Sequence, residues 1–384
     1  MNCIIFVINI DFLLSHRRRF VNALGKRGYT VDVVGLKHQR ESLDNHGFGE
    51  TVKFQILPSW DPSEKVSIWK IFSLLGLLRN YYRSRLGQRL VVIGVVPSIL
   101  VNFSCVGLGC KPVCIISGLG SLYLMSAIRH LRVKRFLQHI FLEVTAFALS
   151  RVTRSKIVFQ NSSDLELVTS RFFWSPKVES KIIRGVGIDV HGLPDLTTSE
   201  RSDTGTKTIL VVARLIYDKG IMQFAKAIKL LKETSDVKFE CVIVGGNTPE
   251  NPGNLRQAEI DRLSSQYGIR FLGHQDDLSR YYKQSDIFCL PSFREGLPLA
   301  CLEAATHALP IATSNVAGCR DTVIHKETGL LFNPHDHTDI FKKLSWMLLN
   351  SEAAKEMGRK GRTFVVENFN QDLINENLLN FMES

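Results

Sequence analysis

The sequence predicts an α/β protein of two doubly wound, Rossmann-like domains, and three observations lead to this prediction. The chain has 384 residues, more than one hydrophobic core usually supports. Apolar runs of strand length alternate with helical stretches, and several are continuous Val, Ile and Leu runs, as in parallel strands covered on both faces. A polar stretch near the middle lacks apolar periodicity and reads as a linker. Domains of this class bind ligands at the carboxyl ends of their strands.

The alternation of apolar runs sets the predicted domains. We expect an N-terminal domain over residues 1–190, a linker over 191–206, a C-terminal domain over 207–365 and a final helical segment over 366–384. The predicted strands are 3–9, 30–34, 90–95, 113–116 and 156–160 in the first domain and 208–213, 239–244 and 287–290 in the second.

Charge divides at the same place as the domains. Residues 1–190 hold 26 Lys and Arg against 12 Asp and Glu, a net charge of +14, whereas residues 191–384 hold 22 and 25, a net charge of −3. A polyanionic partner is therefore expected on one side only. Residues 130–142 alternate bases with apolar side chains at roughly helical spacing, and together with 17–19 and 81–85 they could dock on an anionic leaflet. The alternative is a solvated basic helix with its apolar face in the core.

Compartment and membrane topology follow from cysteines and hydropathy. The eight cysteines show no CxxC spacing, and Cys3, Cys241 and Cys289 fall in apolar strands, which indicates buried, reduced thiols. The uncharged stretch 90–110 contains Gly and Pro and is better explained as strand, helix and turn than as a membrane span. The start of the chain lacks the pattern of a signal peptide. We expect a cytoplasmic protein with a peripheral place on the inner face of the plasma membrane.

The most informative segment is 292–305, in which a loop carrying Glu295 opens a helix carrying Glu303. Pro298 suits the first turn of a helix, because its missing N–H has no intrahelical partner there. The free amides of that turn can hold a diphosphate, and two nearby carboxylates can accept hydrogen bonds from sugar and ribose hydroxyls. We predict donor contacts from Glu303 and from the loop and first turn, namely Gly296, Leu297, Pro298 and Leu299.

A second set of candidates follows other strands. Arg214 and Lys219 come after the strand 208–213 and could neutralise a leaving diphosphate, although an ordinary basic loop is the alternative. Gly245 and Gly273 end two further strand segments and are predicted on the donor side. On the acceptor side the candidates are Ser15, His16, Gly118 and Gly120. The alternatives are that Ser15 only caps a helix and that the glycines only form a tight turn. A catalytic histidine is left open among His16, His130 and His139.

These segments together resemble glycosyltransferase family 4, whose members are retaining enzymes of the GT-B fold. Glu295 and Glu303, with seven residues between them, resemble its E-x7-E motif. Residues 214–220 resemble its R-L-x-x-x-K-G motif. Matches occur in the right order over almost the whole chain. The resemblance implies two domains that face each other across a cleft, a nucleotide-sugar in the C-terminal domain, an acceptor in the N-terminal domain, and a last helix, 371–382, that crosses back to the first domain.

The resemblance also implies an activity. We expect a retaining transfer of a hexose or N-acetylhexosamine from a UDP-sugar to a lipid-diphosphate-linked saccharide in O-antigen, lipopolysaccharide or capsule assembly. Glu295, Arg214 and Lys219 would be catalytic. No cofactor and no metal are expected, since the chain has no Asp-x-Asp and its cationic groups can do a metal's work.

Several rival functions remain. An epimerase on the same fold is one, and a starch- or glycogen-synthase-like transferase is another, although the Lys-x-Gly-Gly-Leu loop is missing. Outside the enzymes, the rivals are an inactive scaffold and a nucleic-acid-binding protein. No nucleic acid is expected as a partner, because the aromatic residues form no stacking platform and no DNA or RNA motif occurs.

Overall fold

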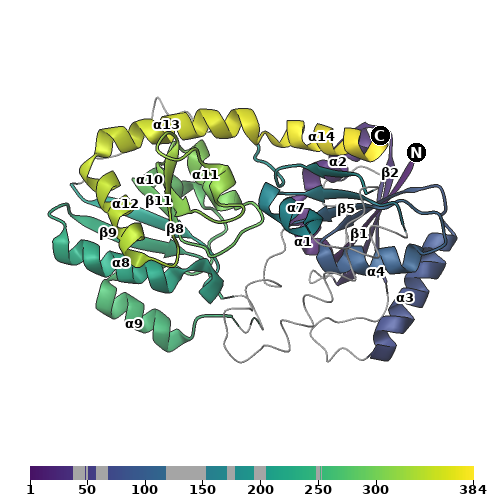
Figure 1. Cartoon of the computed structure of the whole chain (residues 1–384), viewed down its shortest axis with the longest axis horizontal. Coiled ribbons are helices and arrows are strands. Elements are labelled where there is room, and N and C mark those ends of the chain that lie inside the picture. Colours follow the sequence, from purple (N-terminus) through teal and green to yellow (C-terminus); the bar gives the residue numbers. More distant parts are fainter. Residues whose placement is uncertain are drawn as a thin grey trace. The chain divides into compact units, whose positions relative to one another are not determined.

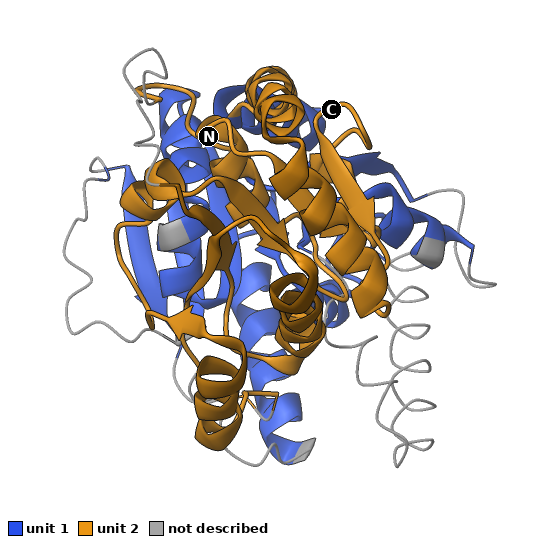
Figure 2. Ribbon diagram, turned by 90° about the vertical axis from the view of Figure 1, so that its left-hand side faces the viewer, with its two compact units in different colours: residues 1–186, 371–384 blue, residues 187–370 orange. Residues whose placement is uncertain are grey.

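The chain divides into two compact units (Figures 1 and 2). The computed structural model describes residues 1–37, 48, 51–57, 68–117, 153–170, 178–193, 205–247, 251 and 253–384. Residues 1–186 and 371–384 form unit 1, and residues 187–370 form unit 2. The passage between the units therefore precedes the linker predicted over 191–206, most of which lies outside the described residues. The reason is that Ile188 already packs in the core of unit 2, where its amide donates to the Phe369 carbonyl at 2.8 Å.

Unit 1 is built on one parallel sheet with the strand order β3-β2-β1-β4-β5-β6-β7 within the described residues. Its strands are β1 (Asn2–Asn9), β2 (Thr30–Lys37), β3 (Val52–Ile56), β4 (Arg89–Ile93), β5 (Val113–Ile116), β6 (Lys156–Phe159) and β7 (Ser180–Ile182). Its helices are α1 (Ile10–His16), α2 (Arg18–Lys26), α3 (Ile68–Arg83), α4 (Val95–Cys105), α7 (Ser162–Thr169) and α14 (Gln371–Glu383).

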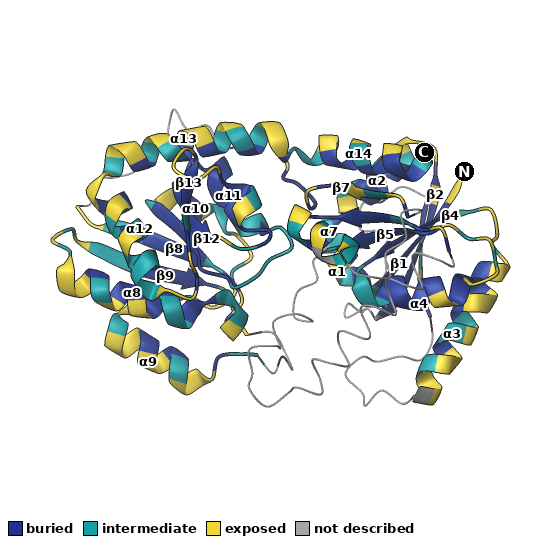
Figure 3. Cartoon of the chain, in the orientation of Figure 1, coloured by how far each residue is buried: buried dark blue, intermediate teal, exposed yellow. Residues whose placement is uncertain are grey.

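Strand β1 shows why both faces of this sheet are apolar. Its side chains alternate, so Cys3 and Ile5 enter a core with α1, α2 and α14, while Ile4 and Phe6 enter a second core with α3 and α4. Burial on both faces requires the continuous apolar run from which the strand was predicted. Figure 3 shows the buried strands between helices whose outer faces are exposed.

The uncharged segment 90–110 forms strand β4 and helix α4, as predicted from its glycines and proline. Within the part of the chain that the structure describes, no helix combines the length and hydropathy that crossing a bilayer requires. The eight cysteines are all free thiols; seven are buried, and Cys110 is half-buried. Burial raises the pKa of the Cys3 thiol to about 12.

The C-terminal helix α14 belongs to unit 1. Leu378 and Met382 of this helix share the core that contains β1 and α2. Arg27 of the α2 end pairs with Glu376, the Nη1 and Oε1 atoms lying 2.8 Å apart, and Arg89 donates to the Met382 carbonyl at 3.0 Å. The last residues of the chain therefore complete the fold of its first domain.

Unit 2 is also built on one parallel sheet, with the order β10-β9-β8-β11-β12-β13. Its strands are β8 (Lys207–Val212), β9 (Phe239–Val244), β10 (Ile269–Phe271), β11 (Ile287–Leu290), β12 (Ile311–Ser314) and β13 (Gly329–Phe332). Its helices are α8 (Ile221–Thr234), α9 (Gln257–Tyr267), α10 (Ser279–Gln284), α11 (Leu299–Thr306), α12 (His337–Leu349) and α13 (Ser351–Asn368), with short 3-10 turns η2 (Tyr217–Lys219) and η3 (Arg320–Thr322).

Both sheets are doubly wound, which confirms the predicted fold class. In unit 2 the chain moves outward from β8 through β9 to β10, and then returns to place β11 on the other side of β8. In unit 1 the same reversal separates β1 from β4. Crevices at the carboxyl ends of strands on either side of such a switch point are where open α/β sheets bind ligands. The loops after β8 and β11 are therefore the place to look in unit 2.

Candidate active site

The loop after β8 places Lys219 beside the loop that follows β11. Strand β8 ends at Val212, and the short turn η2 is followed by its C-cap Gly220, whose φ of +67° is left-handed. A Cβ atom at Gly220 would overlap the Pro291 carbonyl oxygen, so glycine is required both for the turn and for the close approach. The Phe293 amide donates to the Asp218 carbonyl at 2.9 Å and joins this loop to the loop after β11.

The loop after β11 leads into helix α11. Its N-cap is Pro298, with φ −76° and ψ 109°. We predicted Pro298 in the first turn of the helix, and it lies one residue before that turn. Proline is tolerated at this position for the same reason, because no hydrogen bond of the helix needs its amide. No side chain caps α11, and its first turn holds no acidic residue. The amide end of α11 is thus available to an anion.

The two loops meet in an ion pair between the Lys219 ammonium and the Glu295 carboxylate. The two side chains are only 13% and 14% exposed. The Ser292 hydroxyl donates to the same Glu295 oxygen, Oε1, at 2.7 Å, which fixes the rotamer of the carboxylate. This pair spans the β8–β11 switch point and brings together two of the three predicted catalytic residues.

Arg214, the third predicted catalytic residue, is exposed on the same loop as Lys219. Its position is reported by Asp218, whose pKa is raised mainly by burial, lowered by the charges of Lys219 and Arg214, and raised by that of Glu295. Lys219, Arg214 and Glu295 therefore each act electrostatically on Asp218.

Glu303 has a different neighbour. Its Oε2 atom accepts a hydrogen bond from the Tyr282 hydroxyl at 2.9 Å, and Tyr282 on α10 is buried. Burial raises the pKa of the Glu303 carboxyl, and the Tyr282 hydrogen bond opposes that rise. The Tyr282 ring also lies against His307, with ring centroids 5.2 Å apart. The two glutamates of the predicted E-x7-E pair thus have different partners: Glu295 faces Lys219, and Glu303 is held by Tyr282.

Glycines let the loop backbones of unit 2 pack tightly at this edge. Gly318, with φ +78°, has the carbonyl oxygens of Glu295 and Gly296 at 2.5 Å from where its Cβ would be. Gly245 is similarly close to the Ala213 carbonyl, and its amide donates to the Gly273 carbonyl at 2.8 Å. The predicted donor-side glycines Gly245 and Gly273 are therefore adjacent, on the β9 and β10 side of β8.

The acceptor-side candidates are described only in part. Ser15 and His16 lie in α1, directly after β1 and at the carboxyl edge of the unit 1 sheet. Asn9, and not Ser15, caps this helix. The His16 ring stacks on Phe12, and burial lowers its pKa. Gly118, Gly120, His130 and His139 lie outside the described residues.

Tyr282, Ser292, Asp218 and Gly318 belong to the site, but the sequence did not single them out. Tyr282 and Ser292 act through hydrogen bonds to Glu303 and Glu295, and nothing in their local pattern indicates those contacts. Gly318 could have been suspected only as a glycine in a loop after a strand.

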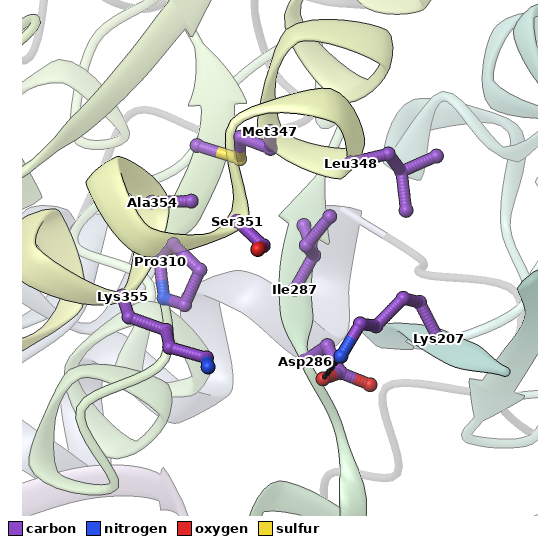
Figure 4. A pocket seen from close by; sticks show the side chains of 9 residues that line it. All are labelled: Lys207, Asp286, Ile287, Pro310, Met347, Leu348, Ser351, Ala354 and Lys355. Carbon is purple, nitrogen blue, oxygen red and sulfur yellow. Dashed lines mark ion pairs between the residues drawn. The ribbon is translucent and has the colours of Figure 1, made fainter. Parts of the chain in front are cut away.

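A small pocket lies at the other edge of the unit 2 sheet (Figure 4). It is lined by residues at the starts of β8 and β11, including Lys207 and Ile287, and by Ser351 and Lys355 of α13. Its volume of about 20 Å³ holds roughly one water molecule. It is therefore too small for a nucleotide-sugar. In the described part of the chain, no three His, Cys, Asp or Glu side chains are grouped as metal ligands.

The sequence is similar to known glycosyltransferases. The family model Glycosyl transferases group 1 matches residues 195–364. An uncharacterized glycosyltransferase of Haemophilus influenzae is 25% identical over 93% of both chains. N,N'-diacetylbacillosaminyl-diphospho-undecaprenol alpha-1,3-N-acetylgalactosaminyltransferase of Campylobacter jejuni is 27% identical over 61% of this chain and 60% of its own length. UDP-Gal:alpha-D-GlcNAc-diphosphoundecaprenol alpha-1,3-galactosyltransferase of Escherichia coli is 26% identical over 58% of each chain.

Solved structures agree on the fold. Sucrose-phosphate synthase of Thermosynechococcus elongatus superposes with a TM-score of 0.80 at 18% identity and covers 100% of this chain and 98% of its own. WaaG, a glycosyltransferase involved in lipopolysaccharide biosynthesis, superposes with a TM-score of 0.73 at 14% identity over 99% of both chains. The two parallel sheets therefore define a protein of the GT-B type. Residues 195–364, which contain the site described above, are the part of the chain that matches the group 1 glycosyltransferase model.

Proposed function

We propose that the protein is a retaining glycosyltransferase of family 4, which moves a hexose or N-acetylhexosamine from a UDP-sugar to a lipid-diphosphate-linked saccharide. The observation that carries the proposal is the Lys219–Glu295 pair at the β8–β11 switch point, beside the uncapped amide end of α11. A cation and helix amides suit the diphosphate, and carboxylates suit the hydroxyls of the sugar and the ribose.

In this proposal Lys219 changes partner when the donor binds. The donor diphosphate takes the ammonium, and the Glu295 carboxylate turns from Lys219 to a hydroxyl of the donor sugar. Ser292 keeps Glu295 anchored during this exchange. Glu303, held by Tyr282, accepts hydrogen bonds from the ribose hydroxyls.

The transfer breaks the bond between the anomeric carbon and the diphosphate oxygen and forms a bond to an acceptor hydroxyl on the same face of the sugar. The diphosphate leaves with the bonding electrons, and its oxygen takes the proton that the acceptor hydroxyl loses. Lys219 and Arg214 stabilise the charge that develops on the leaving diphosphate. They therefore stabilise the transition state more than the bound donor, which lowers the barrier. Because two cations and the amides of α11 supply this stabilisation, the proposal needs no metal.

The acceptor follows from similarity to proteins whose names specify it. The Campylobacter jejuni and Escherichia coli relatives are named for undecaprenol-diphosphate-linked saccharides, and the second also for a UDP-sugar. We extend both features to this chain, together with a role in assembling a surface polysaccharide such as O-antigen, lipopolysaccharide or capsule. Ser15 and His16, at the carboxyl edge of the unit 1 sheet, remain the proposed acceptor-side contacts.

A transfer assay tests the proposal. The purified protein is incubated with a panel of UDP-sugars and a short-chain polyprenyl-diphosphate saccharide, with and without EDTA, and products are identified by mass spectrometry and by NMR of the anomeric proton. We expect one UDP-sugar to be consumed with retention, in EDTA as well. Lys219→Ala should abolish turnover, whereas Lys226→Ala, which removes an exposed lysine of α8, should not. Transfer with inversion, or equal rates in the two variants, would contradict the mechanism.

A further inference from the structure

Helix α3 turns aromatic side chains toward the outside of the molecule. Its buried side chains, which include Leu74, Leu78 and Tyr81, lie three or four residues apart and mark the face toward the unit 1 core. At about 100° per residue, the opposite face carries Trp69 and Phe72 in the first turns of the helix. Their side chains are 78% and 60% exposed. Figure 3 shows this helix at the margin of unit 1.

In its first turns α3 departs from an ordinary surface helix, which is polar on the side away from the core. Trp69 and Phe72 are one turn apart and therefore neighbours on the surface. Leaving both in water forgoes the burial free energy of two of the largest apolar side chains. A patch of this kind, rimmed by charge, is a signature of an interaction surface.

The charged side chains of helix α3 itself are all positive. Helix α3 holds Lys70, Arg79 and Arg83 and no acidic residue. Arg83 lies on the same outward stripe as the aromatic pair and is exposed. Arg79 is exposed as well, although its guanidinium also donates to the Val106 carbonyl at the end of α4, at 2.6 Å.

The position of the patch in the fold suits a lipid-linked acceptor. Helix α3 follows β3 in a doubly wound sheet, so its first turn lies toward the carboxyl edge of the unit 1 sheet. The β1 strand ends at the same edge and leads into α1, which holds Ser15 and His16. Trp69 and Phe72 are therefore on the side of unit 1 on which its ligand is expected.

We propose that the outward face of α3 docks on an anionic phospholipid leaflet. Trp69 and Phe72 enter the boundary between head groups and acyl chains, where aromatic side chains are favoured, and the arginines contact the head groups. The charge favours a lipid surface over a neutral protein groove, because the whole N-terminal half has a net charge of +14. This docking does not depend on which donor or acceptor the enzyme uses.

The docking surface differs from the one expected on sequence grounds. Arg17 was included there, but it is 3% exposed, and burial lowers its pKa to about 10. Tyr81 and Tyr82 are buried as well, whereas Arg83 of the same expected segment is exposed. Residues 130–142 lie outside the described part of the chain.

Vesicle co-sedimentation of the full-length protein tests the docking. Vesicles of phosphatidylethanolamine with phosphatidylglycerol are compared with pure phosphatidylcholine, at low and high salt. We expect wild type to bind the anionic vesicles, and Trp69→Ser with Phe72→Ser to weaken partitioning at least tenfold. The matched control, Leu349→Ser with Leu373→Ser, removes side chains that are 66% and 51% exposed elsewhere and should bind as wild type does.

Two further measurements identify the contact. Calorimetric UDP binding should be unchanged in the α3 variant, so that a docking defect is separated from a folding or donor-site defect. Brominated lipids should quench the tryptophan fluorescence of wild type, and Trp69→Phe should lose most of that quenching. The proposal is overturned if wild type ignores anionic vesicles, if the α3 variant binds them equally, or if the variant instead breaks up an oligomer in light scattering.

Discussion

Replacing Glu295 with Gln should tighten the binding of UDP while slowing transfer. Glu295 holds the Lys219 ammonium, and both side chains are largely buried. A diphosphate that takes Lys219 must displace this carboxylate and then lie close to it. Gln has the same shape and can still accept the Ser292 hydroxyl hydrogen bond through Oε1, so the loop should keep its conformation.

The size of the effect follows from the charges. Two like unit charges about 5 Å apart repel by about 3 kcal/mol at an effective dielectric constant of about 20. Screening by water and by Arg214 leaves an expected net gain of about 1–2 kcal/mol, or about 5–30-fold in Kd. Loss of a hydrogen bond to a charged group costs about 1.5–3 kcal/mol, so kcat should fall about 10–150-fold.

Isothermal titration with UDP and a turnover assay with the UDP-sugar measure the two effects separately. Glu327→Gln is the control, because it removes the same charge from an exposed turn of the same unit. It should change neither value. Equal or weaker UDP binding by Glu295→Gln would refute the partner exchange, since the carboxylate would then not compete with the diphosphate.

Three further predictions concern Glu303 and the glycine that supports the Glu295 loop. Tyr282→Phe removes the hydrogen bond that keeps the buried Glu303 carboxylate ionised, so UDP binding should be lost at a higher pH than in wild type as pH falls, as calorimetry over a pH series would show; an unchanged profile would count against the ribose contact. Glu303→Gln should raise Tm at neutral pH and weaken UDP binding, because the raised folded-state pKa makes the ionised carboxylate unfavourable in the fold; the gain in Tm should vanish at acidic pH, where wild type is also protonated, and a lower Tm at pH 7 would contradict the argument. Gly318→Ala should lower Tm by several degrees and weaken UDP binding at least tenfold, because its Cβ would push against the Glu295 carbonyl; Gly246→Ala, whose Cβ meets only ordinary contacts, is the control and should be tolerated.

Most central strands could be predicted from sequence because burial on both faces leaves a continuous apolar run. The buried central strand β12 was not predicted, since half of its Ile-Ala-Thr-Ser sequence is polar. Strands β5, β9 and β11 have the predicted bounds. The edge strands β3 and β7 were not predicted, since each pairs on one side only and carries exposed side chains such as Ile56 and Ile182. A short, partly exposed run has no pattern that separates it from a loop.

Individual residues of the candidate site could be predicted from the sequence, but the contacts between them could not. Lys219 and Glu295 could be proposed from their loops and motifs, but 76 residues separate them in sequence. Their ion pair depends on β8 and β11 being neighbours, which only the sheet order reveals. The role of Tyr282 depends on how α10 packs beside α11, and a single tyrosine in an amphipathic helix carries no signal of that contact.

Calorimetric titration of UDP into the protein without added metal tests the donor site most directly, with Lys219→Ala and the exposed-lysine control Lys226→Ala measured beside it. The proposed site predicts that UDP binds in preference to ADP and GDP, that Lys219→Ala weakens UDP at least tenfold, and that Lys226→Ala leaves it unchanged. The absence of UDP binding by the wild-type protein, or equal UDP affinity in Lys219→Ala and wild type, would contradict the assignment of the β8–β11 crevice as the donor site.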